Sequence, residues 1–146
     1  MMVNARIDLT RDLEGTPVVL ACFDLDEAGV AAAAYAVAVA RTERYRNVEM
    51  SVDDVLAMRE LTALADDLDA LAHVAGACTV VLRPARLTVL RDAAEEFVAG
   101  RDAADWVRAQ DAEHLPAARS LVLPLGDLCA EALRAALSPE AFDPRP

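Results

Sequence analysis

The sequence has few aromatic residues, no lysine and no cluster of glycines. Its 146 residues include six aromatic side chains and five glycines, and all fourteen basic residues are arginine. Because the glycines occur singly, the glycine-rich loops that cradle phosphates in nucleotide-binding proteins are excluded. Arginine without lysine, beside abundant Ala, Leu, Val, Asp and Glu, is typical of a GC-rich coding sequence and indicates a bacterial origin.

The chain also lacks positive charge overall. Twenty-five acidic residues against fourteen arginines give a formal charge of −11 at neutral pH. Nucleic acids and anionic membranes are therefore excluded as partners, since binding to phosphates relies on Lys and Arg. A charged protein partner is expected to be basic. The longest apolar run, residues 28–40, is shorter than the roughly 20 residues that span a bilayer.

The cysteines are few, odd in number and far apart. Cys22, Cys78 and Cys129 each lie among apolar residues, which predicts free thiols in a reducing compartment, so we expect a cytoplasmic protein. His73 and His114 stand at no metal-ligand spacing from a cysteine or from each other. No cofactor or metal is expected, although the sequence leaves open whether these five side chains converge in space.

The N-terminal third predicts a β-hairpin. Residues 3–9 alternate between apolar and polar side chains, as in a strand with one exposed face, and this first strand can leave an unpaired edge. A turn cluster ends at Pro17, and residues 18–23 form a short continuous apolar run, as in a strand covered on both faces. Two further short strands are predicted over residues 48–50 and 80–82.

Each of the later strands is expected to lead directly into an amphipathic helix. Asp26 precedes a helix that runs to about Arg41, Ser51 and Asp54 approximate a capping box, and Pro84 suits a first helical turn. A third helix is expected to stop at Gly100. Asp102 is expected to cap a fourth that ends near His114, and a last helical segment is expected to kink or restart at Pro124.

These patterns predict one α+β domain over residues 1–138. An N-terminal β-hairpin and two short strands would form a small mixed sheet, packed by four to five amphipathic helices. Residues 139–146 contain three prolines in a polar stretch and predict a flexible C-terminal tail.

Arg83 and Arg86 are the candidate ligand-binding residues. They flank Pro84 in the first turn of a helix, where the helix dipole disfavours positive charge. Two arginines beside free helix N–H groups are suited to binding an anion such as phosphate or carboxylate. The alternative is pairing with carboxylates of this acidic chain.

The last helix carries the candidate interface. Leu121, Leu125 and Leu128 follow helical spacing, and further apolar residues such as Leu133 lie beside them, which is more than one contact face needs. No catalytic arrangement is recognisable, and carboxylate pairs such as Asp24 and Asp26 are explained as helix caps. The sequence therefore favours a non-enzymatic interaction or assembly module acting as a homodimer. The alternative is a protein or enzyme that binds an anionic small molecule through Arg83 and Arg86.

Overall fold

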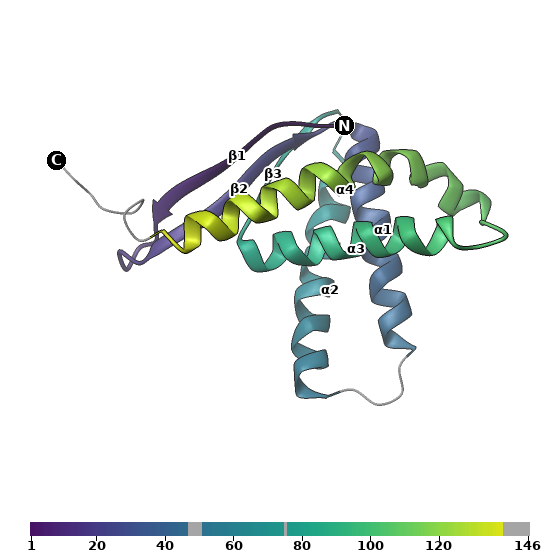
Figure 1. The fold of residues 1–146 in the computed structure, drawn as a ribbon, viewed down its shortest axis with the longest axis horizontal. Helices are drawn as coiled ribbons and strands as arrows, with labels where there is room; N and C mark the ends of the chain where they lie inside the picture. Colours follow the sequence, from purple (N-terminus) through teal and green to yellow (C-terminus); the bar gives the residue numbers. More distant parts are fainter. Residues whose placement is uncertain (47–50, 75, 139–146) are drawn as a thin grey trace.

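A computed structural model describes residues 1–46, 51–74 and 76–138 and shows an α+β fold (Figure 1). Three strands form one sheet: β1 (Met2–Arg11), β2 (Pro17–Leu25) and β3 (Cys78–Leu82), in the order β1-β2-β3. Four helices are present in the described part of the chain: α1 (Glu27–Tyr45), α2 (Val52–Ala72), α3 (Pro84–Asp102) and α4 (Ala109–Ala136). The predicted α+β class and helix number agree with this architecture.

The sheet formed by the described residues is antiparallel and not mixed as predicted, because both of its strand pairs are antiparallel. The α1–α2 helical hairpin between β2 and β3 returns the chain to the point where β2 ends, so Cys78 at the start of β3 pairs with Leu25. A connection that returns to the same end of the sheet must give an antiparallel neighbour. The fourth predicted strand, over residues 48–50, lies outside the described residues.

The predicted hairpin is present and longer than expected. Its loop is closed by Asp12, whose side chain accepts hydrogen bonds from the backbone of Glu14 and Thr16, with Gly15 at a positive φ of 81°. β1 carries one extra residue between Val3 and Arg6, where Asn4 takes a φ of 55°. This β-bulge irregularity interrupts the pairing of the outer strand.

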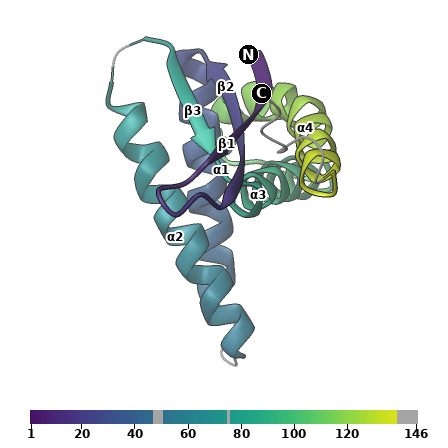
Figure 2. The same cartoon turned by 90° about the vertical axis from the view of Figure 1, so that its left-hand side faces the viewer.

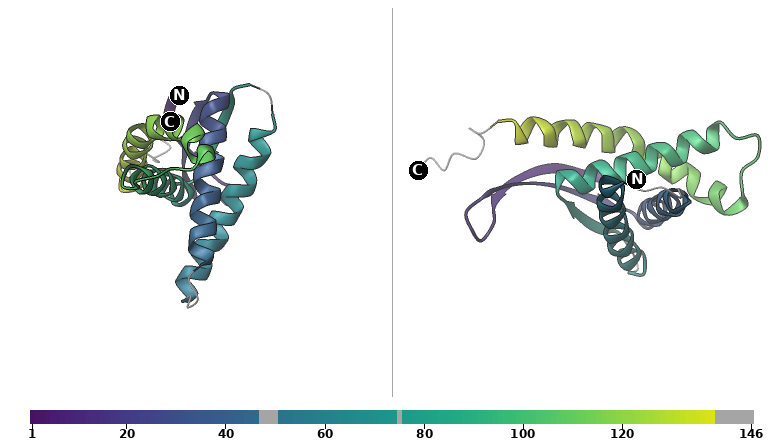
Figure 3. Two further views of the ribbon diagram at one scale, coloured as in Figure 1. Left: turned by 90° about the vertical axis from the view of Figure 1, so that its right-hand side faces the viewer. Right: turned by 90° about the horizontal axis from the view of Figure 1, so that it is seen from below.

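The two faces of the sheet differ in cover. On the inner face, alternate residues of β2 and β3 such as Phe23, Leu25 and Val80 are buried against the helices. α4 runs along this side of the sheet, as the view from below shows (Figure 3). On the outer face Val3 and Val81 are about half exposed. The sheet is therefore packed on one face only.

The predicted helix starts are confirmed at three places. The Asp26 carboxylate accepts a hydrogen bond from the backbone of Gly29 and caps α1. Ser51 and Asp54 form a reciprocal capping box at the start of α2, and Pro84 is in the first turn of α3. Asp24 is not a cap: it lies in β2, where Asn4 and Thr79 donate hydrogen bonds to its carboxylate.

The predicted boundaries of the later helices are wrong. α3 continues through Gly100 to Asp102, whose carboxylate binds Arg119 instead of capping a new helix. One continuous helix, α4, replaces the two predicted segments and includes Pro116 and Pro124. The buried stripe of α4 extends on both sides of Pro124, and this burial outweighs the roughly 3 kcal/mol cost of an interior proline.

The same stripe corrects the predicted interface. Leu121, Leu125 and Leu128 are at most 2% exposed, because α4 packs on α1, α3 and the sheet of its own chain. They have no surface left to bury against a second copy. Leu133, which is 60% exposed, is the one predicted interface residue on the surface.

A second, smaller core lies where α1, α3 and α4 cross. Ala32, Ala36 and Ala118 are almost fully buried there against Phe97 and Val98. Small side chains let helix backbones approach closely, and the large ring of Phe97 fills the remaining space. The alanine-rich sequence of α1 is thus explained by close helix packing.

Replacing Leu125 with alanine is expected to lower the free energy of unfolding by about 3 kcal/mol, because it opens a cavity in the core. Leu133→Ala on the same helix is the matched control and should change stability by less than about 0.5 kcal/mol. Urea denaturation followed by circular dichroism measures both. Equal effects of the two substitutions would contradict the burial described here.

Candidate functional site

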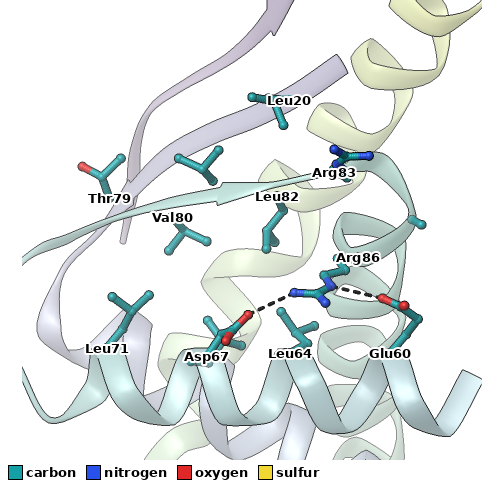
Figure 4. A pocket seen from close by; sticks show the side chains of 13 residues that line it. Leu20, Glu60, Leu64, Asp67, Leu71, Thr79, Val80, Leu82, Arg83 and Arg86 are labelled. Atoms are coloured by element: carbon teal, nitrogen blue, oxygen red, sulfur yellow. Dashed lines mark hydrogen bonds and ion pairs between the residues drawn. The ribbon is translucent and has the colours of Figure 1, made fainter. Parts of the chain in front are cut away.

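A groove of about 570 Å³ lies between β3 and α2. Figure 2 shows β3 between β2 and the upper part of α2, and Figure 4 shows the groove from close by. Its walls are mostly apolar. Val80 and Leu82 of β3 face Leu64 and Leu71 of α2 across it, and Leu68 lines it as well.

Arg83 and Arg86, the two arginines singled out from the sequence, both line this groove. The guanidinium of Arg86 lies between two carboxylates of α2: it donates to Glu60 at 3.1 Å and to Asp67 at 3.0 Å (Figure 4). The two acids compensate its charge, as the intramolecular alternative predicts.

Arg83 is exposed at the start of α3, and its guanidinium group makes no hydrogen bond or ion pair to any residue that the structure describes. The groove is therefore lined by two arginines and two carboxylates, so it has no net positive charge. Of the two arginines predicted to bind an anion, only Arg83 has no carboxylate partner among the described residues.

The groove adjoins the free edge of the sheet. β3 pairs with β2 on one side only, so part of its backbone N–H and C=O groups has no strand partner in the described chain. Its sequence, CTVVL, has no charge, no proline and no glycine, and Val81 is 51% exposed. The edge and the groove together form one surface, the β3 edge surface.

A second, more polar hollow of about 350 Å³ lies where α1 and α3 end and α4 begins. Asp111, only 7% exposed, is at its base. The Tyr35 hydroxyl donates a short hydrogen bond to one carboxylate oxygen of Asp111, and Arg101 donates to the other at 3.1 Å. Arg101 also lies 3.5 Å from a carboxylate oxygen of Glu43.

Aromatic rings contact the Tyr35 and Arg101 side chains of this polar network. The Tyr35 ring stacks on His114 at a centroid distance of 4.4 Å and meets the Phe97 ring edge to face at 5.6 Å. The Arg101 guanidinium lies 4.7 Å from the Phe97 ring centre. The network thus joins α1, α3 and α4 through charge-assisted hydrogen bonds and cation–π contact.

The network is suited to holding charge and not to moving protons near neutral pH. The hydrogen bond from Tyr35 holds the pKa of Asp111 below its ordinary value. Burial, with the hydrogen bond to Asp111, raises the pKa of Tyr35 to about 12. Because general acid–base catalysis needs a pKa near the working pH, neither group matches that task.

The histidines and cysteines do not converge. His73 caps the end of α2, with its Nδ1 atom 2.6 Å from the Asp69 carbonyl oxygen, while His114 of α4 stacks on the Tyr35 ring. The Cys22 thiol contacts Asp8 on the outer face of the sheet. Burial raises the pKa of both Cys22 and Cys129, which disfavours the reactive thiolate.

Within the described ranges no three His, Cys, Asp or Glu side chains lie close enough together to hold a metal ion. Nor does any described helix combine the length and apolar character needed to cross a membrane. Comparison of the chain with protein-family models, curated proteins and solved structures found no match. The site is therefore defined by its geometry alone.

Asp111→Asn is expected to destabilise the protein by about 2 kcal/mol at pH 7, because it removes a buried charged acceptor from Tyr35 and Arg101. The pKa of Asp111 is lowered by folding, so its contribution is complete above the ordinary carboxyl value of about 4 and is lost as pH falls below it.

Thermal unfolding of wild type and variant between pH 3 and pH 7 measures this difference. Asp102→Asn, which removes an exposed partner of Arg119, is the control and should have a much smaller effect because solvent screens the pair. A stability difference for Asp111→Asn that stays constant down to pH 3 would contradict the role of the ionised carboxylate.

Proposed function

We propose that this chain is a non-enzymatic protein-interaction module that forms a homodimer by antiparallel pairing of two β3 strands. The observation that carries the proposal is the difference between the two edges of the sheet. Natural sheets protect an exposed edge with charged residues, proline or a bulge, because an unprotected edge pairs with other strands. One edge of this sheet is protected in that way and the other is not.

β1 is the protected edge. It carries Arg6, Asp8 and Arg11, and the extra residue at Asn4 breaks the regular pairing. Charged side chains and a bulge both hinder the addition of another strand. The unpaired edge expected for the first strand therefore exists, but it is the less suitable edge for association.

β3 is the unprotected edge, and its sequence suits pairing with itself. In an antiparallel pair centred on Val80, Val80 lies opposite its own copy, Thr79 opposite Val81 and Cys78 opposite Leu82. The inward side chains of the added strand would extend the apolar layer over the groove beside Leu71, which is partly exposed, while Leu64 and Leu68 are already buried beneath it. Strand addition thus covers both the free backbone groups and the groove.

Charge also favours a second copy as the occupant. Arg83 follows directly after β3 and has no ion-pair partner among the described residues, whereas the C-terminal half of α2 carries Asp66, Asp67 and Asp69. The C-terminal end of β3 and the C-terminal end of α2 lie at opposite ends of the groove (Figure 4). Antiparallel pairing therefore brings Arg83 of each copy toward the acidic part of α2 of the other.

Sedimentation or light scattering is expected to give the wild-type protein twice the 15.6 kDa mass of one chain at micromolar concentration. Val81→Lys should give a monomer with an unchanged circular dichroism spectrum, because it places a charge on the β3 edge at an exposed position.

Val3→Lys is the matched control, since Val3 lies on the other edge strand with a similar exposure of 48% against 51% for Val81. This variant should remain a dimer. A monomeric wild type, or loss of the dimer in Val3→Lys and not in Val81→Lys, would overturn the proposal.

A further inference from the structure

The polar hollow between α1, α3 and α4 has a charge opposite to that of the whole protein. It is lined by three guanidinium groups, those of Arg46, Arg101 and Arg108, and by two carboxylates, those of Glu43 and Asp111. The chain as a whole carries −11. A local excess of positive charge in an acidic protein concentrates anions at that place.

One arginine already serves both carboxylates. Arg101 donates to Asp111 and lies within ion-pair distance of Glu43, and its side chain is only 17% exposed. Tyr35 supplies a second donor to Asp111. The negative groups of the hollow are therefore satisfied without the two remaining arginines.

Among the described residues, no carboxylate lies within ion-pair distance of Arg46 or Arg108, although the charge of Arg108 contributes to the lowered pKa of Asp111. Neither guanidinium group makes a hydrogen bond or ion pair to any residue within 1–46, 51–74 or 76–138. They reach the hollow from different elements, Arg46 from the end of α1 and Arg108 from the residue before α4. Guanidinium groups that line one hollow from two elements can together donate to a bound oxyanion, which accepts several charged hydrogen bonds at once.

The rest of the lining suits a small organic molecule. Ala38 and Val39 give one apolar wall, and the volume of about 350 Å³ is at the lower end of the range for small-molecule sites. We propose that this hollow binds the phosphate or carboxylate group of a small metabolite between Arg46 and Arg108, with Arg101 held in place by Asp111 and Glu43. The site is separate from the β3 edge surface and does not depend on dimer formation.

The test is titration calorimetry at low ionic strength with two probes in separate arms, inorganic phosphate and succinate, against chloride as a blank. We expect saturable binding of at least one probe, and the tighter of the two identifies which oxyanion chemistry the hollow prefers. Arg46→Gln and Arg108→Gln should each weaken that binding by about tenfold or more, because each removes charged hydrogen bonds to the anion.

Arg83→Gln is the matched control. Like Arg108, Arg83 is an exposed arginine that directly precedes a helix and makes no capping hydrogen bond, but it lies in the other groove. It changes the net charge of the protein by the same amount and should leave binding unchanged. Absence of saturable binding by wild type, or an equal loss in Arg83→Gln, would overturn the proposal, and unchanged thermal unfolding would show that the variants are folded.

Discussion

The fold depends on the return of the chain through the α1–α2 helical hairpin. Because two helices and not one connect β2 to β3, the chain comes back to the end of the sheet that it left, and Cys78 pairs with Leu25. This constraint makes β3 antiparallel to β2, and because β1 occupies the other side of β2, β3 forms the opposite edge of the described sheet. It also sets α2 beside that edge, so that the groove and the unpaired backbone of β3 have one common origin.

The packing of α1, α3 and α4 depends on few large side chains. Buried alanines let α1, α3 and α4 approach, and Phe97 fills the space between them. Asp111 then ties the helices together through Tyr35 and Arg101. A buried carboxylate is tolerable only with such partners, since an unpaired buried charge is strongly destabilising. The three side chains of this network also line the polar hollow.

Local features were predictable from the sequence, and nonlocal ones were not. The hairpin, the capping box at Ser51 and the start of α3 at Pro84 depend on residues close in sequence. Strand direction depends on where a connection returns, which no local pattern reveals. Periodicity places Leu121, Leu125 and Leu128 on one face of a helix, but it does not tell whether that face packs on its own chain or on a second copy. Tyr35, Arg101 and Asp111 come from three elements, and no spacing links them.

The central claim is that the β3 edge is the surface through which this protein associates. Amide hydrogen exchange followed by mass spectrometry at two protein concentrations tests it most directly, because pairing between chains protects backbone N–H groups in proportion to the dimer present. We predict slower exchange in β3 at the higher concentration, with no change in β1. Exchange in β3 that does not depend on concentration, or concentration-dependent protection confined to β1 or to the exposed face of α4, would contradict the account.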